Sequence, residues 1–292
     1  MLFPPPLPPA SPFLKWAGGK GQLLAQFERF FPKSLARRGY VEPFVGSGAV
    51  FFHIVATGRP ARCTLLDANP DLINLYVQIR DHVEELIPAL TAHRAQHNGV
   101  SQEAREAYYY GVRAQKPDPG SVASAARFLY LNKTCFNGLH RLNSKGQFNV
   151  PIGSYVEPRI FDPAHLRVVS NLLADVTIAT TSFRDCERFI SSGDFVYLDP
   201  PYEPLSLSSS FKAYAKEGFS QADQTALRDM VARISPPTTW MLSNSTAPFI
   251  EELYAQPGMF KHHVLASRLI NSKAANRGKI AELLVTNYPV TP

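Results

Sequence analysis

The chain has 292 residues, of which 45% are hydrophobic and 18% are charged, so it is long and apolar enough to bury one large core or two smaller ones. Thirty Lys and Arg residues against 24 Asp and Glu give a formal net charge of +6, which favours a polyanionic partner. Three scattered cysteines and the lack of an apolar run of about 18 residues argue against a disulfide framework, a zinc site and a membrane span, and favour the reducing cytoplasm.

The excess of positive charge is concentrated in two segments without acids. No Asp or Glu occurs between Pro119 and Val156, or from Leu253 to Ala281, although both segments contain several Lys and Arg residues. Such segments are typical of a nucleic-acid-binding surface. The alternative is a solvated positive face on a slightly basic enzyme.

The first third of the chain begins with a proline-rich leader, residues 1–11, which we expect to be disordered. The stretch "YVEPFVGSGAVFFHI" at 40–54 then predicts a strand, a glycine turn and a helix. The stretch "CTLLDANPDLINLY" at 63–76 predicts a second strand that ends in an acid. Together these segments have the sequence pattern of a nucleotide-binding βαβ unit.

The middle of the chain has a helical pattern. Apolar residues recur at spacings of three and four from Asp71 to Ala95, which predicts one amphipathic helix. Two more helices are expected at 101–114 and 121–131, and the turn residues Asn143–Gly146 predict a β-hairpin over 138–153.

Strand signals return at 175–180, 193–199, 238–244 and 280–288, with helical stretches between them. The sequence therefore predicts an α/β fold with a largely parallel sheet. We expect a catalytic domain made of residues 12–70 and 160–292, interrupted by a helical and hairpin domain at 71–159.

Three features of the amino-terminal part are candidates for ligand binding. Gly46 and Gly48 permit a sharp turn and close approach to backbone N–H groups, although such turns are often structural. Asp67 ends the second strand, where a ribose is bound in many nucleotide-binding folds; alternatively it caps the helix that follows.

The segment "PFLKWAGGK" at 12–20 is the third of these features. Its glycines allow the backbone to wrap a ligand, and Lys20 offers a cation to a carboxylate or phosphate. The alternative places Trp16 in the core, and Lys15 and Lys20 on the surface.

The motif "LDPPY" at 198–202 is the most specific signal. It follows an apolar run, so it is expected at the carboxyl end of a strand, where open α/β sheets bind ligands. Two prolines stiffen the chain, leaving the Asp199 carboxylate and the Pro200 carbonyl as acceptors, and Tyr202 adds a flat aromatic face. This arrangement suits the 6-amino group of adenine, because two acceptors favour a localised lone pair on that nitrogen.

Five separated motifs now resemble one family. They are "FLKWAGGK", "VEPFVGSG", "LLDANPDLINLY", "LYLNKTCFNGLHRLNSKGQFNVPIGSY" and "DFVYLDPPY". In this order they resemble the Dam-type DNA adenine methyltransferases of the α-group, and the resemblance extends from Pro12 to Tyr288. It implies a Rossmann-like methyltransferase sheet with an inserted target-recognition domain. It also implies S-adenosylmethionine as cofactor, duplex DNA as substrate, and direct attack by a flipped adenine.

The resemblance also implies roles for individual residues. Trp16 and Lys20 are expected at the methionine end of the cofactor, and Asp67 at its ribose. Asp185 is expected at the cofactor adenine, or is an ordinary surface carboxylate. The remaining cofactor contacts are expected from Glu42, Phe44, Gly46, Ser47, Gly48 and Asp199. Catalysis is assigned to Asp199, Pro200 and Tyr202, and the Ser-rich stretch Ser206–Ser210 resembles the family's mobile loop.

The implied DNA contacts gather in the acid-free segment and near the amino terminus. Arg141 and Lys15 correspond to guanine contacts, and Lys145 is expected at a phosphate. Further contacts around the duplex are expected from Phe136, Asn137, Leu139 and Pro151. The family implication is methylation of adenine in GATC. The alternative for Arg141 is a nonspecific phosphate contact.

Other functions fit the residues less well. A cytosine-C5 methyltransferase needs a cysteine nucleophile, typically after a proline, and none of the three cysteines has one. An RNA or protein-glutamine methyltransferase, an adenine methyltransferase of other specificity and an inactive DNA-binding protein remain alternatives. We expect a monomer that needs no metal and no membrane.

Overall fold

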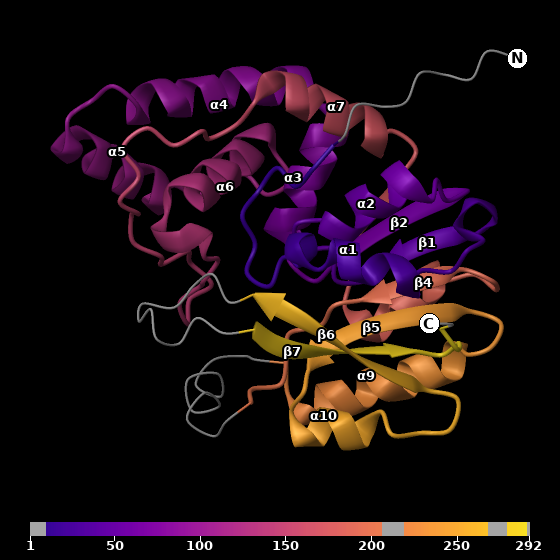
Figure 1. Cartoon of the computed structure of the whole chain (residues 1–292). Coiled ribbons are helices and arrows are strands. Elements are labelled where there is room, and N and C mark those ends of the chain that lie inside the picture. The colour runs from indigo at the N-terminus through magenta and orange to yellow at the C-terminus, as the bar shows by residue number, and fades with distance from the viewer. Residues whose placement is uncertain (1–9, 206–218, 268–278, 291–292) are drawn as a thin grey trace, which may run out of the picture. The chain divides into compact units, whose positions relative to one another are not determined.

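The computed structural model describes residues 10–205, 219–267 and 279–290 (Figure 1). Most of the expected leader and the whole of the Ser-rich stretch lie outside the described residues. Chain contacts define two compact units. Residues 10–19, 46–56 and 69–180 belong to unit 1, and residues 20–45, 57–68 and 181 onward belong to unit 2. The functional division at 71 and 159 stays a prediction, since compactness assigns no role to a unit.

Unit 2 contains six strands of the seven-stranded sheet, in the order β2-β1-β4-β5-β7-β6. Their bounds are β1 Gly39–Glu42, β2 Arg62–Asp67, β4 Phe195–Leu198, β5 Thr239–Ser245, β6 Phe260–Ser267 and β7 Lys279–Thr286. Strands β2, β1, β4 and β5 are parallel, and β7 is antiparallel to both β5 and β6. The predicted α/β class and the strands predicted for the sheet are confirmed. Strand β6 was not predicted, because the basic residues and histidines of this edge strand hide its apolar pattern.

The central strands are buried along their whole length. Every residue of β1 and β4 is buried, as expected for parallel strands covered on both faces. The sequence order of the strands reverses between β1 and β4. In doubly wound sheets this is the point where ligands bind, beyond the carboxyl ends of the strands.

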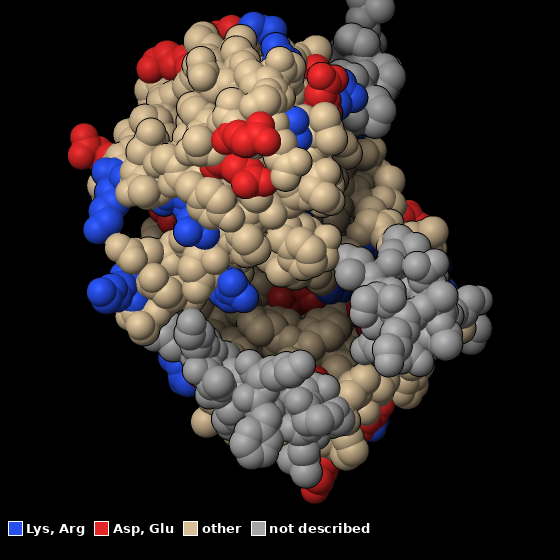
Figure 2. Space-filling view, turned by 90° about the vertical axis from the view of Figure 1, so that its left-hand side faces the viewer, with Lys and Arg blue, Asp and Glu red and all other residues tan. Residues whose placement is uncertain are grey.

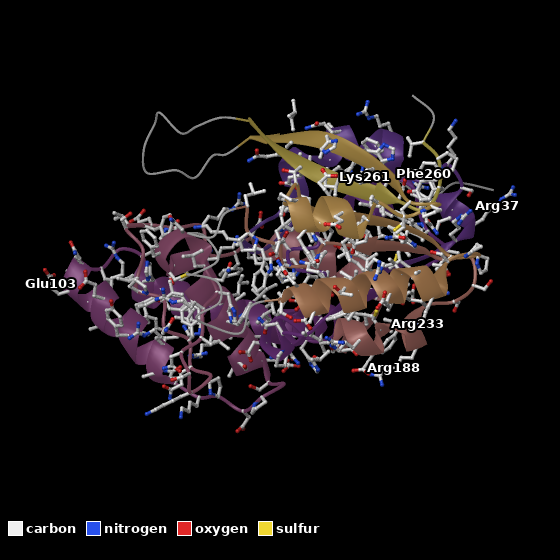
Figure 3. All side chains as sticks on the ribbon, turned by 90° about the horizontal axis from the view of Figure 1, so that it is seen from below. Arg37, Glu103, Arg188, Arg233, Phe260 and Lys261 are labelled. Carbon is white, nitrogen blue, oxygen red and sulfur yellow. The ribbon has the colours of Figure 1, made fainter. Side chains whose placement is uncertain are left out.

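Helices and single turns surround this sheet in unit 2. They are η1 Lys20–Gln22, α1 Leu24–Phe27, η2 Glu28–Phe30, η3 Leu35–Arg37, η5 Phe183–Phe189, α9 Gln221–Ile234 and α10 Pro248–Leu253. Figure 1 shows α9 and α10 together beside strands β5 to β7. Ion pairs link both helices to neighbouring elements: Arg233 of α9 pairs with Glu187 of η5, and Lys261 of β6 pairs with Glu251 of α10 at 2.9 Å. Figure 3 labels Arg233 and Lys261.

Unit 1 is mainly helical. Its elements are α2 Ala49–Thr57, α3 Pro70–Asp81, α4 Val83–His97, α5 Gln102–Ala114, α6 Val122–Thr134, η4 Phe136–Gly138, α7 Pro163–Leu173 and strand β3 Thr177–Thr180. The helices expected at 101–114 and 121–131 are confirmed as α5 and α6. The single helix predicted over 71–95 is wrong, because His82 leaves the helical region at φ −135° and ψ 33° and separates α3 from α4. The apolar spacing runs through this break since both helices bury a face.

The start of α3 settles which residue caps it. Asn69 Oδ1 accepts hydrogen bonds from the backbone N–H groups of Asp71 at 3.0 Å and Leu72 at 3.2 Å, and Pro70 occupies the first turn. Asn69 is therefore the cap, and the alternative that Asp67 caps this helix is wrong.

The predicted hairpin is present as a turn with irregular arms. The Gly146 N–H donates to the Asn143 carbonyl at 2.9 Å, and Leu142 and Phe148 form an isolated antiparallel bridge. Residues 138–153 contain no regular strand, so the two-stranded arms were predicted wrongly. Pro151 has no N–H group to donate to a ladder, and the arms pair only at the isolated bridge.

Two further findings concern the described residues. None of their helices is both long and apolar enough to cross a bilayer. The three cysteines are unpaired and buried, and no group of three or more His, Cys, Asp or Glu in the described ranges is arranged to hold a metal ion.

Candidate active site

The centre of the site in unit 2 is an ion pair at the carboxyl end of β4. Lys20, in η1, has only 4% of its surface exposed, and its Nζ lies 2.8 Å from Asp199 Oδ2. A buried ammonium needs such a partner, because an unpaired charge in a low dielectric is costly. The alternative that Lys20 is a surface residue is therefore wrong.

The second oxygen of Asp199 has no such partner. Oδ1 is buried and accepts no hydrogen bond within the described part of the chain. The pKa of Asp199 is raised above its usual value, chiefly by burial. The Lys20 cation lowers it, the nearby Glu282 carboxylate raises it, and the Tyr202 hydroxyl lowers it. A buried acceptor without a donor is unusual in a folded protein and suits an amino group of a ligand.

Tyr202 is held at both its hydroxyl and its ring. Its hydroxyl donates to Glu282 Oε2 at 2.8 Å, and Lys20 Nζ lies 4.8 Å from the ring centroid. Burial, followed by the charges of Asp199 and Glu282, raises the pKa of the Tyr202 phenol far above its usual value, so it stays a neutral donor.

The sequence prediction missed Glu282. It lies on β7, and its register partner on β5 is Ser245, at the carboxyl end of that strand. A signal was present in the sequence: Glu282 is the first acid after the acid-free stretch from Leu253 to Ala281, and it stands within the apolar run "IAELLV".

The predicted cofactor residues of unit 2 lie near the ends of β1 and β2 and in η5. Glu42 is buried and accepts a hydrogen bond from the Tyr40 hydroxyl at 2.8 Å. Phe44 stacks on Phe183 with ring centroids 6.0 Å apart. Asp67 is half-buried at the end of β2. Because β1, β2 and β4 are parallel, Glu42, Asp67 and Asp199 end at the same edge of the sheet.

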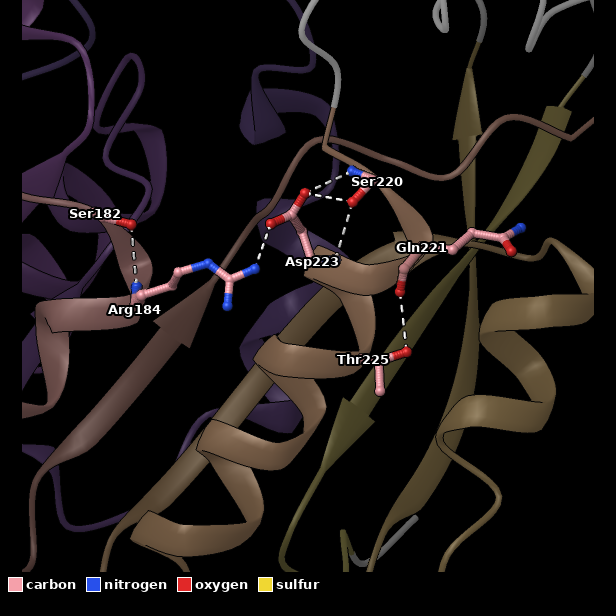
Figure 4. A network of polar contacts seen from close by, with 6 residues as sticks. All are labelled: Ser182, Arg184, Ser220, Gln221, Asp223 and Thr225. Carbon is pink, nitrogen blue, oxygen red and sulfur yellow. Dashed lines mark hydrogen bonds and ion pairs between the residues drawn. The ribbon is translucent and has the colours of Figure 1, made fainter.

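Asp185 is exposed in η5, within a loop fixed by its neighbours. The preceding Arg184 pairs with Asp223 at 2.7 Å, and Asp223 forms a reciprocal capping box with Ser220 at the start of α9 (Figure 4). Ser182 caps the Arg184 N–H from the other side. This network fixes the backbone beside Asp185, while the carboxylate of Asp185 itself stays accessible.

The predicted glycine turn lies in unit 1 and is sterically constrained. Gly46 has φ +48° and Gly48 has φ +70°, conformations that disfavour other residues. A Cβ at Gly46 would lie 2.8 Å from Trp16 Cδ1, and one at Gly48 would lie 2.7 Å from Tyr76 Oη. The glycines therefore permit close packing as well as a tight turn, and Ser47 between them is buried.

Trp16 is half-buried in unit 1. Its ring stacks on His140, with centroids 5.7 Å apart and an interplanar angle of 26°. Phe128 packs against both rings. The predicted alternative of a core role for Trp16 is thus partly correct, since this residue packs within an aromatic cluster.

The segment containing Lys15 is joined to the turn at 136–139 through one side chain. Asn132 accepts from the Lys15 N–H at 2.8 Å and donates to the Lys15 carbonyl at 2.7 Å and the Gly138 carbonyl at 3.3 Å. Lys15 Nζ lies 3.8 Å from the centroid of the Tyr155 ring. Two stretches predicted to contact DNA are therefore adjacent, although they are far apart in the sequence.

Several predicted DNA contacts are exposed in unit 1. Phe136 is 51% exposed and Leu139 is 39% exposed. Asn137 has φ +54°, and the carbonyl of the exposed Pro151 accepts from the Phe136 N–H at 2.9 Å. Exposed apolar side chains beside basic residues are a common feature of nucleic-acid interfaces.

Basic residues lie on the same unit. Arg141 is exposed, and its Nε donates to Asn149 Oδ1 at 2.6 Å, which orients the guanidinium. Lys145 is exposed at the hairpin turn. Burial, together with the charges of Lys15 and Arg159, lowers the pKa of Lys133 to about 8. Figure 2 shows blue Lys and Arg groups on the left of the described surface.

The parallel sheet with an Asp-Pro-Pro-Tyr turn at its ligand-binding edge defines the class: a Rossmann-like methyltransferase that acts on an amino group. The family model for D12 class N6 adenine-specific DNA methyltransferases matches residues 16–269. The chain belongs to this family, and it is an adenine-specific DNA methyltransferase that uses S-adenosylmethionine as methyl donor.

Individual relatives are similar over nearly their whole length. The type II methyltransferase M.MjaIII of Methanocaldococcus jannaschii is 41% identical over 95% of this chain and 99% of its own. The type II methyltransferase M1.LlaDCHI of Lactococcus lactis subsp. cremoris is 40% identical over 95% of each chain. The DNA adenine methylase of Vibrio cholerae is 36% identical over 95% of this chain and 96% of its own.

The two charges nearest Asp199 generate a prediction about pH. Protonation of Asp199 removes its acceptor, so turnover should fall as the pH drops through its pKa. Lys20→Met removes the cation that lowers this pKa and should move the acid limb of kcat to higher pH, whereas Glu282→Gln should move it to lower pH. The measurement is kcat against pH with saturating cofactor and DNA. Shifts of both variants in the same direction would contradict this electrostatic assignment.

Two glycines with similar backbone angles provide a second test. Gly138 has φ +64° and Gly146 has φ +70°, but a Cβ at Gly138 would lie 2.5 Å from Lys15 Cβ, whereas one at Gly146 meets nothing within 4 Å. Gly138→Ala should therefore displace Lys15 and weaken DNA binding about tenfold more than Gly146→Ala, the matched control for backbone strain. Fluorescence anisotropy with a labelled duplex measures both, and equal losses would remove Lys15 from the interface.

Proposed function

We propose that this enzyme methylates the 6-amino group of a flipped adenine in duplex DNA, at GATC. The observation that carries the proposal is the buried Oδ1 of Asp199, which has no hydrogen-bond partner in the described part of the chain and lies in the same motif as the aromatic ring of Tyr202. S-adenosylmethionine supplies an electrophilic methyl group when it is bound. The chain's own residues bind the base, orient its nitrogen and stabilise the charge that forms there.

Asp199 orients the amino nitrogen. Its Oδ2 is tied to Lys20, which leaves Oδ1 to accept one N–H of the base. The Pro200 carbonyl is the second acceptor in this mechanism, and the two prolines limit its movement. Two fixed acceptors favour a nitrogen with a localised lone pair, and the carboxylate offsets the positive charge that develops on attack.

Tyr202 supports the flipped base. Duplex DNA has to expose the adenine before its amino group can reach a buried acceptor, and an aromatic face compensates for part of the lost stacking. The hydroxyl bond to Glu282 fixes one edge of the ring. Lys20 near the ring helps to hold its position from within the protein.

Cofactor binding is assigned to residues of both units, each by its own chemistry. In unit 2 the Asp67 carboxylate suits the ribose hydroxyls, Phe44 offers an aromatic face, and Asp185 is accessible to an amino group of the cofactor adenine. Glu42 lies at the same edge. In unit 1 the glycine turn supplies backbone N–H groups, and Trp16 is assigned to the methionine end of the cofactor.

Recognition of the target sequence is assigned to unit 1. Arg141 is preorganised by Asn149, which supports a paired contact to guanine O6 and N7. Lys15 supplies the second guanine contact, and Lys145 a phosphate contact. Phe136, Asn137, Leu139 and Pro151 pack around the duplex. The names of relatives, including the DNA adenine methylase of Vibrio cholerae, support the substrate class. We further propose a cytoplasmic monomer.

The first prediction from this mechanism concerns Asp199. Asp199→Asn keeps the shape of the side chain but removes its charge, and Asp199→Ala removes both acceptors. Turnover should fall at least about 100-fold to 1,000-fold in both variants, as expected for loss of a preorganised electrostatic partner. Single-turnover methyl transfer from labelled cofactor measures this, with circular dichroism to confirm folding. Near-normal turnover in a folded variant would exclude the mechanism.

Arg141 provides the test of sequence recognition. Arg141→Ala should relax preference at one guanine position, with a loss of about 1–3 kcal/mol of discrimination, if the guanidinium contacts a base. Lys145→Ala is the matched control on the same hairpin and should weaken all duplexes equally while lowering the salt slope. Rates on duplexes with single substitutions in GATC measure both effects. A uniform loss for Arg141→Ala, or a wild-type target other than GATC, would reject the assigned recognition code.

A further inference from the structure

A series of hydrogen-bonded, buried polar side chains contacts the Asp-Pro-Pro-Tyr turn in unit 2. Gln224 of α9 and Asn244 of β5 have no exposed surface, and Ser245 is 6% exposed. Gln224 shares the buried face of α9 with Leu227, Met230 and Val231, where an apolar residue would ordinarily stand. Burying an amide is costly unless its hydrogen bonds are made, so their partners are informative.

Those partners lead to the backbone on both sides of Tyr202. Gln224 Nε2 donates to the Pro201 carbonyl at 2.9 Å. Asn244 Nδ2 donates to Gln224 Oε1 at 3.0 Å. Asn244 Oδ1 accepts from the Glu203 N–H at 3.4 Å. The Pro201 carbonyl and the Glu203 N–H belong to the two peptide bonds that flank Tyr202.

Two further bonds strengthen this chain. Asn244 Oδ1 accepts from the Ser245 N–H at 2.8 Å, and the Ser245 hydroxyl donates to the Glu203 carbonyl at 2.6 Å. The orientation of both amides is fixed, because a carbonyl accepts and an N–H donates at opposite ends of the chain. Rotating either amide by 180° would place two acceptors, and also two donors, opposite each other.

We propose that Gln224 and Asn244 are positioning residues for the reaction, and that they set the plane of Tyr202 and the direction of the acceptors that precede it. Pro200 and Pro201 are stiff, so a fixed Pro201 carbonyl also limits movement of Asp199. An error of about 1 Å in such an alignment is enough to reduce a rate about 100-fold. This inference rests on the proposed function, in which Tyr202 stacks on the target adenine.

Asn287 offers a matched control. Its Oδ1 accepts from the Trp240 N–H at 2.8 Å, and its Nδ2 donates to the Thr238 carbonyl at 2.8 Å. It therefore fixes backbone in the same manner as Asn244, but at the amino end of β5, away from the turn. Asn287→Ala should lower the melting temperature without changing the turnover of the folded enzyme.

The experiment compares Gln224→Ala, Asn244→Ala, the double variant and Asn287→Ala in the full chain. We expect kcat to fall about 10-fold to 100-fold in both single variants, with KM for S-adenosylmethionine changed less than about threefold. The double variant should be no slower than the slower single variant, since the two substitutions interrupt the same series of hydrogen bonds. If Asn244→Ala does not fold, Asn244→Asp replaces it, because it keeps the acceptor and loses the donor to Gln224.

Hydrogen exchange of the Glu203 amide gives a readout that needs no activity. Its protection should fall in Asn244→Ala and stay at the wild-type value in Asn287→Ala. Unchanged protection and unchanged kcat in the folded Gln224 and Asn244 variants, or a matching fall of kcat in Asn287→Ala, would overturn the proposal. Failure of the proposed function has a different signature: wild-type enzyme that does not methylate adenine, while Glu203 protection still responds to Asn244.

Discussion

The ion pair between Lys20 and Asp199 is the interaction on which the site depends. Asp199 stands at the end of a buried strand, where its carboxylate is stabilised by a nearby cation. Lys20 supplies this cation: its Nζ lies 2.8 Å from Asp199 Oδ2, and only 4% of the residue is exposed. Because this pair uses one oxygen of Asp199, the other is left as a buried acceptor. The same ammonium lies near the Tyr202 ring, so a single cation organises both halves of the motif.

The sheet determines which other residues reach this point. Parallel strands bring Glu42, Asp67 and Asp199 to one edge, because each acid stands at or just beyond a carboxyl end. Strand β7 runs the other way, so Glu282 near its beginning aligns with Ser245 at the end of β5. The antiparallel strand thus adds a second carboxylate, which anchors the Tyr202 hydroxyl and raises the pKa of Asp199.

Local sequence was sufficient for the class of fold and for the main catalytic motif. The apolar run before Asp199 predicted a strand, and the prolines predicted a stiff turn at its end; both follow from interactions between neighbouring residues. The helices α5 and α6 were also predicted correctly from the local sequence pattern. Prediction failed where the local pattern was ambiguous. The break at His82 interrupts no apolar periodicity, and the arms of the hairpin, one of which contains Pro151 without an N–H donor, pair only at an isolated bridge.

By itself, then, the sequence determined the alternation of strands and helices, the acceptor turn and the family to which the chain belongs, since these depend on short stretches of residues. Only the tertiary structure determined which side chains pair with the residues of the acceptor turn. Nothing local indicates that Lys20 neutralises Asp199, that Glu282 holds Tyr202, or that the Gln224 amide reaches the turn. Those contacts join positions between 23 and 179 residues apart in the sequence, and only the packing of the sheet and α9 brings them within hydrogen-bonding distance.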